Sequence, residues 1–229
     1  EKLLKSLGVK VHHNLPGVGQ NLQDHFQLRC VYQTNNSSTY NDIYWSYTKK
    51  IYALFKYVFF KKGPFAEGVS LAGLCGIELV NNFKHSIQMH LTLASGDDTN
   101  KLHRESGVTI SVYQEKPTSR GSVQIKSRNP DDGLEVNINY LSTEHDLQSL
   151  IASVRLTRRI MESKAMSKLI KKEIYPGQGV KTQKQIISYA RSTGTTIYHQ
   201  CGTCKMGNDS NSVVSSNLRV LPMKNLRVI

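Results

Sequence analysis

Ile87–Leu93 reads Ile-Gln-Met-His-Leu-Thr-Leu, a strict alternation of apolar and polar side chains. Val108–Val112 alternates in the same way, and after the turn Asn129–Gly133 the pattern returns in Leu134–Tyr140. Successive side chains of a strand point to opposite faces, so this pattern predicts antiparallel strands with one buried face. With a further short strand at Leu28–Gln33, the middle of the chain is expected to form an antiparallel sheet.

Two helices are expected after these strands, and each begins with a capping-box pattern. Thr143 and Thr182 stand three residues before Asp146 and Gln185, the spacing at which side chains and backbone amides satisfy one another. The apolar stripe of 147–161 is long enough to cover one face of the sheet. Sheet and helices together predict an α+β fold.

A third helix is expected before the sheet, capped by Asn41 or Asp42 and ended by Gly63–Pro64. Its aromatic and aliphatic residues recur every three to four positions from Tyr44 to Phe59. We interpret this stripe as core packing rather than as a ligand site.

Composition narrows the class of protein. Of the 229 residues 38% are hydrophobic, and no apolar run approaches the roughly 18 residues that a membrane span needs. No membrane span is therefore expected. The 4 cysteines are too few for a disulfide scaffold.

The formal net charge is +13. An excess of this size suits an anionic partner such as nucleic acid, a membrane surface or an acidic substrate. The sequence contains no recognisable nucleic-acid module, so a nucleic-acid partner is not expected. The simplest interpretation is that many of the basic residues form solvated faces of two amphipathic helices. These residues are Lys49, Lys50, Lys56, Lys61 and Lys62, and Arg155, Arg158, Arg159, Lys164, Lys168, Lys171 and Lys172.

The two ends suggest part of a longer protein. The chain opens on Glu1 with no apolar signal-peptide core, and it closes on the strand-like run Leu226–Ile229.

The segment Thr195–Gly207 concentrates reactive side chains, and three kinds of chemistry are open to it. A structural zinc site needs four ligands, whereas His199, Cys201 and Cys204 offer three and no second C-x-x-C occurs. No metal site is therefore expected. A redox dithiol at the two cysteines would belong at a helix N-terminus, but the residues that follow resemble a turn.

The third possibility is an acid/base role for His199. Imidazole, with a pKa of about 6.5, exchanges a proton near neutral pH at little cost. A lone histidine is more often a hydrogen-bonded structural group. Residue types alone leave both interpretations open.

Several stretches resemble motifs of the glucose–methanol–choline (GMC) flavoprotein oxidoreductases, in the family's order. Leu15–His25 is similar to L-P-G-V-G-x-N-L-x-D-H, and Tyr198–Gly207 to Y-H-P-V-G-T-C-K-M-G. Ser119–Pro130 resembles the hairpin S-R-G-x-V…S-x-x-P, and Asn139–Leu141 the N-Y-L that follows it. Val213–Ile229 resembles V-V-D-P-x-L-R-V…L-R-V-x-D-A-S. The similarity is nearest to insect, glucose-dehydrogenase-like members.

The resemblance implies a division of the chain. The family joins an FAD-binding Rossmann-like α/β domain to a substrate domain built on an antiparallel sheet. Residues 1–26 and 196–229 would be incomplete pieces of the FAD domain, and 27–195 the substrate domain. The sequence would represent about the C-terminal two-fifths to half of a full-length member.

The resemblance also implies an activity, the oxidation of a CH–OH group of a small-molecule alcohol with FAD as cofactor. The electron acceptor would be oxygen or a quinone-like carrier. His199 would be the general acid/base, Gly202 would let the backbone approach the flavin, and Cys204 would be a packing thiol. Asp24 and His25 are interpreted as structural hydrogen-bonding partners. Many members are secreted, but the location of this protein is left open.

The sequence departs from the family pattern in two places and lacks two of its parts. Gln200–Cys201 replaces Pro-Val, which is expected to alter substrate contacts, and Ser215–Ser216 replaces Asp-Pro, which puts a local turn in question. The fingerprint G-x-G-x-x-G, which holds the FAD pyrophosphate, and the second active-site His or Asn do not occur. We expect this chain alone neither to hold FAD tightly nor to turn over. The alternative is a GMC-like scaffold without activity that serves as a binding or interaction protein.

Overall fold

The computed structural model of the chain describes residues 1–35, 38–80, 83–97 and 101–229. The chain divides into two compact units, which we call the loop unit and the sheet unit. The loop unit comprises Glu1–His25, Pro117–Glu144 and Thr196–Ile229, and the sheet unit comprises Phe26–Lys116 and His145–Thr195. Each is described by itself.

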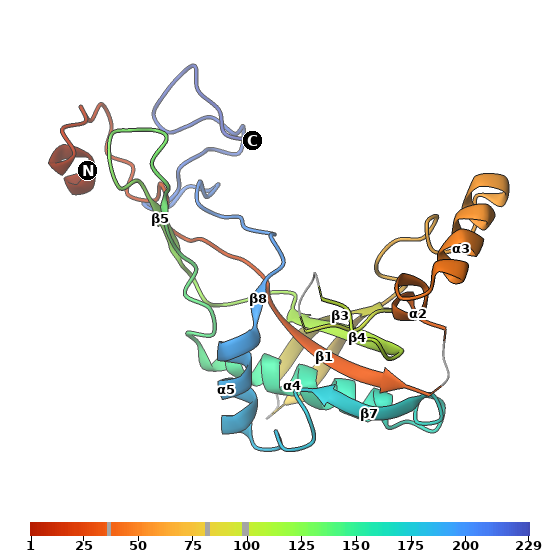
Figure 1. The fold of residues 1–229 in the computed structure, drawn as a ribbon. Coiled ribbons are helices and arrows are strands. Elements are labelled where there is room, and N and C mark those ends of the chain that lie inside the picture. Colours follow the sequence, from red (N-terminus) through yellow and green to blue (C-terminus); the bar gives the residue numbers. More distant parts are fainter. Residues whose placement is uncertain (36–37, 81–82, 98–100) are drawn as a thin grey trace. The chain divides into compact units, whose positions relative to one another are not determined.

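The sheet unit is built on an antiparallel sheet with strand order β2-β3-β4-β1-β7, and the short strand β8 pairs with β1 (Figure 1). The strands are β1 (Phe26–Thr34), β2 (Ala72–Val80), β3 (Phe83–Thr92), β4 (Gly107–Gln114), β7 (Ile170–Tyr175) and β8 (Thr195–Thr196). The α+β class is confirmed, and so is the antiparallel sheet for the strands predicted at Leu28–Gln33, Ile87–Leu93 and Val108–Val112. The prediction is wrong for Leu134–Tyr140, which contributes to a separate two-stranded hairpin and buries no face there. The sequence patterns do not predict β2 and β7, because neither shows a clean alternation of apolar and polar residues.

The two faces of the sheet differ as the alternation requires. Ile87 and Met89 of β3 and Val112 of β4 are buried on one face. The helix α4 (Glu144–Met161) runs along this face (Figure 1), and the hydroxyl of Thr157 lies 3.9 Å from the Met89 sulfur. Each fully buried side chain of this kind stabilises the unit by about 1.5–3 kcal/mol. The predicted covering helix is therefore confirmed.

The shorter predicted helix is α5 (Gln183–Thr193). Thr182 Oγ1 accepts a 3.3 Å hydrogen bond from the Gln185 backbone N–H, and the Gln185 side chain accepts one of 2.9 Å from the Thr182 N–H. This reciprocal pair confirms the predicted capping box.

The third predicted helix is in fact two helices. Thr39, rather than Asn41 or Asp42, caps α2 (Tyr40–Tyr44), and Ser46 caps α3 (Tyr47–Phe60). Asp42 instead accepts a 2.8 Å hydrogen bond from the Thr39 backbone N–H, as the third residue of a capping box. Cap residues at 39 and 46 therefore divide the predicted helix into two.

The core-packing interpretation of the aromatic stripe is wrong for α3. Of its residues only Ala53 is buried, and its large apolar side chains are exposed. Within the described part of the chain, no helix is both long and apolar enough to cross a membrane.

The loop unit has little regular secondary structure. It contains α1 (Lys2–Ser6) and the hairpin of β5 (Ser122–Gln124) and β6 (Glu135–Asn137). β6 is shorter than predicted, because Asn139 and Leu141 adopt left-handed backbone angles, with φ of 59° and 53°, just beyond it. A small core is formed by Val213, Val214 and Val220, with Leu15 and Cys204 packed against it.

Residues 117–144 cluster with the loop unit, although the expected division places them in the substrate domain. The assignment of 1–26 and 196–229 to an FAD domain and of 27–195 to a substrate domain stays a prediction.

Candidate active site

Asp24 is the centre of the hydrogen bonds around His199. Its side chain is buried, with 4% of its surface exposed. One carboxylate oxygen accepts from the Tyr140 hydroxyl, the Thr196 hydroxyl (2.5 Å) and the Gln200 amide (3.3 Å). The other accepts from the backbone N–H of His199 at 3.1 Å. A buried carboxylate is costly unless donors surround it, so this network explains why an aspartate is tolerated here and confirms Asp24 as a hydrogen-bonding partner.

Tyr140 acts as a donor in this network. Burial of the phenol, and then its hydrogen bond to the Asp24 carboxylate, raises the pKa of Tyr140 above its ordinary value of 10. The hydroxyl therefore keeps its proton near neutral pH.

The motif loop before Asp24 holds the residues after His199 by backbone hydrogen bonds. Gln23 and Cys201 exchange two N–H···O bonds of 2.9 Å each. The Asn21 side-chain amide donates to the Gly202 carbonyl at 3.1 Å. Gly202 has a φ of +97°, and a Cβ there would collide with the Asn21 carbonyl oxygen. Glycine is thus required at 202 by the packing of two chain segments, while its expected place beside a flavin stays a prediction.

The hairpin segment is attached to the same loop. The Val123 N–H donates to the Gly19 carbonyl at 2.7 Å. Arg120 Nε donates to Asn21 Oδ1 at 3.2 Å, and Asn139 Nδ2 donates to the Arg120 carbonyl at 3.0 Å. Stretches near residues 20, 120, 140 and 200 therefore interlock within one unit.

His199 combines a fixed backbone with an exposed side chain. Its ring lies edge-on to that of His25, with the ring centres 5.7 Å apart and an angle of 63° between the planes. An imidazole on a fixed backbone and open to a ligand is compatible with an acid/base role.

The departures from the family pattern are accommodated locally. The Gln200 amide nitrogen donates to the Thr196 hydroxyl at 2.9 Å and to Asp24, so its N–H groups bind within the unit. At Ser215 the turn closes, because its N–H donates to the Arg219 carbonyl at 2.9 Å and its carbonyl accepts from Leu218 at 2.8 Å.

The two cysteines of this segment lie in different surroundings. Cys201 is exposed and Cys204 is partly buried against the Val213–Val220 core, and both are free thiols. In the described residues 205–229 no helix follows them, whereas a redox dithiol belongs at a helix N-terminus. In the ranges covered by the structure, no group of three or more His, Cys, Asp or Glu residues is arranged to hold a metal ion.

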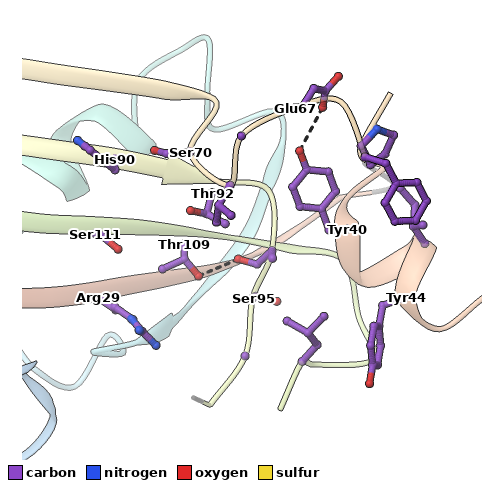
Figure 2. A pocket seen from close by; sticks show the side chains of 18 of the residues that line it. Arg29, Tyr40, Tyr44, Glu67, Ser70, His90, Thr92, Ser95, Thr109 and Ser111 are labelled. Carbon is purple, nitrogen blue, oxygen red and sulfur yellow. Dashed lines mark hydrogen bonds between the residues drawn. The ribbon is translucent and has the colours of Figure 1, made fainter. Parts of the chain in front are cut away.

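A cavity of about 810 Å³ opens in the sheet unit (Figure 2). Arg29 of β1, His90 of β3, and Thr109 and Ser111 of β4 line it from the polar face of the sheet. Residues of α2 and of 64–70 line it elsewhere. Its volume is in the range of small-molecule sites.

The charges of the described residues around this cavity are mixed. Among them, Arg29 and Lys50 are cations and Glu67 is a carboxylate. Glu67 accepts a 3.1 Å hydrogen bond from the Tyr40 hydroxyl, and the Lys50 ammonium lies 4.8 Å from the centre of the Tyr44 ring. Such a lining suits a neutral or anionic ligand better than a cation.

The sequence analysis did not predict this cavity, although some of the residues that line it belong to strands that it did predict. His90 and Thr92, and Thr109 and Ser111, are the polar members of the alternating strands whose apolar members are buried. Taking the polar face of each strand as a candidate surface would have found these residues.

The two units define a class of protein, an α+β chain with a ligand-sized cavity on an antiparallel sheet and an exposed histidine in an interlocked loop unit. Residues 117–229 match the family model of the GMC oxidoreductases. The chain belongs to this family.

Similar sequences extend over the whole chain. An alcohol dehydrogenase [acceptor] of Pseudomonas putida is 34% identical over 227 residues, covering 99% of this chain and 41% of its own length. An oxygen-dependent choline dehydrogenase of Pseudomonas fluorescens is 36% identical over 230 residues, covering 100% of this chain and 40% of its own length. The chain therefore spans about two-fifths of the length of these relatives. The insect, glucose-dehydrogenase-like character stays a prediction.

Solved structures share the fold. A formate oxidase of Aspergillus oryzae superposes with a TM-score of 0.83 at 18% identity, over 99% of this chain and 44% of its own. Pyridoxine 4-oxidase from Mesorbium loti gives a TM-score of 0.79 at 22% identity, over 99% and 40%.

Proposed function

We propose that the full-length protein is an FAD-dependent oxidoreductase that oxidises the CH–OH group of an alcohol, with His199 as the general acid/base. The observation that carries this proposal is the pairing of an exposed imidazole with a backbone held by the buried Asp24 carboxylate. A base that takes a proton from a hydroxyl has to be positioned within hydrogen-bond reach, so a fixed backbone favours the role.

The exposure of the His199 side chain supports a position at one edge of a flavin site. The backbone N–H groups of Tyr198, His199 and Cys201 bind within the loop unit, which leaves the exposed His199 side chain to face a cofactor or substrate. The pyrophosphate fingerprint does not occur in this sequence. When bound, FAD would supply the acceptor for the hydride that leaves the alcohol carbon.

Within this proposal, His199 receives and holds the hydroxyl proton, and Asp24 keeps the His199 backbone in place through its N–H. The electron acceptor is oxygen or a quinone-like carrier. The catalytically inactive scaffold is the outcome that the experiment below must exclude.

The test uses the full-length protein, loaded with FAD and mixed anaerobically with a panel of alcohols while flavin absorbance is followed. We expect at least one alcohol to bleach the flavin, and His199→Ala to slow this reduction by about 10²- to 10⁴-fold. His12→Ala, at another exposed histidine of the loop unit, is the matched control and should reduce at the parent rate.

A His199→Ala variant that is reduced within a few-fold of the parent would remove the acid/base role. A full-length protein that binds no FAD, or whose flavin no alcohol reduces, would leave the inactive scaffold.

The cavity favours one class of alcohol. Among the described residues that line the cavity, Arg29 and Lys50 are cations and Glu67 is a carboxylate, and Lys50 already covers the face of Tyr44. A quaternary ammonium would need aromatic faces and carboxylates without competing cations. We therefore expect faster flavin reduction by neutral aliphatic or aromatic alcohols than by choline, and the reverse preference would refute this assignment.

A further inference from the structure

The helix α3 (Tyr47–Phe60) presents a row of apolar side chains to solvent, which we call the apolar stripe: Tyr47, Ile51, Leu54, Phe55 and Val58. Their exposed fractions are 84%, 69%, 53%, 48% and 50%. Residues 47, 51, 54 and 58 are spaced by four, three and four positions, which puts them on one face of the helix. The stripe is therefore continuous rather than a set of scattered residues.

Aromatic rings widen the stripe towards the end of the helix. The ring centre of Phe55 lies 4.8 Å from that of Phe59 and 5.9 Å from that of Phe60. Single exposed apolar residues are ordinary on protein surfaces, but a contiguous row marks an interaction surface.

The remainder of α3 and the two residues after it are basic, with Lys49 and Lys56 on the helix face opposite the apolar stripe. Lys49, Lys50 and Lys56 lie in the helix, Lys61 and Lys62 follow it, and the helix contains no acidic residue. The Lys56 ammonium lies 5.1 Å from the centre of the Tyr52 ring, and the Lys61 ammonium 5.2 Å from that of Tyr57. The Lys49 ammonium lies 4.0 Å from a carboxylate oxygen of Asp42, a residue outside the helix.

We propose that α3 docks on the surface of an anionic lipid bilayer, with the apolar stripe in the interfacial layer and the lysines among the headgroups. An apolar face that includes aromatic rings, with lysines on the opposite face, is the pattern of helices that lie in this layer. Lysine stems can stay against apolar surface while their ammonium groups reach the phosphates. The net charge of +13 adds attraction to the same surface.

The length of α3 fits this orientation. Its 14 residues extend about 21 Å at the rise of an α-helix. The hydrocarbon core of a bilayer is about 30 Å thick, so the helix lies along the surface instead of crossing it.

The docking helix borders the cavity of the sheet unit. Lys50 of α3 lines the cavity, as do Tyr44 just before the helix and several residues between 64 and 70 after it. Tyr44, Glu67 and Ser70 are labelled in Figure 2. An alcohol dissolved in lipid would reach the rim of the cavity directly from the bilayer. This consequence rests on the proposed function, whereas docking does not.

The test is co-sedimentation of the full-length protein with vesicles. One set contains phosphatidylcholine with about 30% phosphatidylserine, and the other contains phosphatidylcholine alone. We expect binding to the anionic set to exceed binding to the neutral set and to weaken as salt rises from about 0.05 to about 0.5 M.

Variants assign the binding to α3. The double change Ile51→Glu and Val58→Glu should lower partitioning onto anionic vesicles at least about ten-fold, because it puts carboxylates in the stripe. Lys56→Gln alone should lower it about five-fold. The matched control is Leu134→Glu with Val136→Glu, at loop-unit side chains that are 52% and 53% exposed, and it should bind like the parent.

Three outcomes would overturn the proposal. They are a parent protein that does not sediment with anionic vesicles at low salt, a glutamate variant that binds as well as the parent, and a glutamate variant that is unstable without lipid. The last result would show that another part of the full-length protein covers the stripe. None of these measurements involves alcohol oxidation, so the docking proposal and the proposed function can fail independently.

Discussion

The sheet unit and the loop unit reach a folded state by different means. In the sheet unit, alternating strands bury one face beneath α4, and residues such as Leu28, Ile87 and Ile151 are each 1% exposed. In the loop unit, the hydrophobic core is small. Distant stretches are joined by hydrogen bonds that one buried carboxylate accepts and by hydrogen bonds between paired backbone segments. Burial of apolar area therefore stabilises the sheet unit, whereas hydrogen bonds between polar groups position the His199 backbone.

The largest stability effect is expected in the core under α4. Ile151→Ala should lower the free energy of unfolding by about 2–5 kcal/mol, because it removes a buried side chain and leaves a cavity. Denaturant unfolding of the full-length protein measures this, with Arg155→Ala at an exposed position of the same helix as the control. If the comparison holds, flavin reduction per folded molecule stays at the parent rate.

Asp24→Asn should have a smaller effect on stability and a larger one on catalysis. It removes the charge from a carboxylate with several donors, which should cost about 1–3 kcal/mol. Since the His199 backbone is then held less firmly, flavin reduction should slow roughly 10- to 100-fold. The control is Asp131→Asn in an exposed turn. A loss of stability without any loss of rate would break the distinction between the two units.

Thr182→Ala tests a local device of the sheet unit. It removes the side-chain acceptor of the α5 capping box and should lower the free energy of unfolding by about 1 kcal/mol. Thr182→Ser keeps the hydroxyl and should restore most of the stability. Equal values for the two variants would mean that the cap contributes nothing.

The smallest effect is expected for the pH dependence of stability that His85 of the sheet unit contributes. His85 is buried and its Nδ1 lies 2.6 Å from the Ser149 hydroxyl, with the His145 ring stacked at 4.6 Å. Burial, and then the neighbouring His145, lowers the pKa of His85 below its ordinary 6.5. The unfolded chain therefore binds more protons than the native one just below this value, so stability is full above about pH 6.5 and falls as the medium is acidified.

Denaturant midpoints at about pH 7.5 and pH 5.5 measure this dependence. The decrease in the denaturant midpoint on acidification should be smaller in His85→Gln than in the parent. The control His13→Gln, at an exposed position, should keep the parent's dependence. An unchanged slope in His85→Gln would show that other groups carry it.

The predicted elements of the sheet unit were those whose signals are local. The alternation in β3 and β4 and the capping box at Thr182 each lie within a few residues, and each is confirmed. Where two local signals competed, the prediction failed: Thr39 caps α2, because Asp42 serves as the third residue of its capping box. β2 and β7 carry no periodic signal, and their neighbours in the sheet decide their conformation.

The motifs located the candidate site in the sequence, but they did not show how its residues contact one another. Asp24 and His199 are 175 residues apart, and no periodicity connects them. The resemblance selected the residues, while the reason for glycine at 202 is a close approach to Asn21 that only folding creates.

By itself, the sequence determined the α+β class, the antiparallel sheet, its covering helix and the family to which the chain belongs. These follow from side-chain periodicity, caps and motifs, which are properties of neighbouring residues. Only the tertiary structure decided that Asp24 collects its four donors, that α3 is exposed rather than packed, and that polar strand residues line a cavity. Contacts between distant residues and the burial of each face depend on how the whole chain packs, which local patterns do not encode.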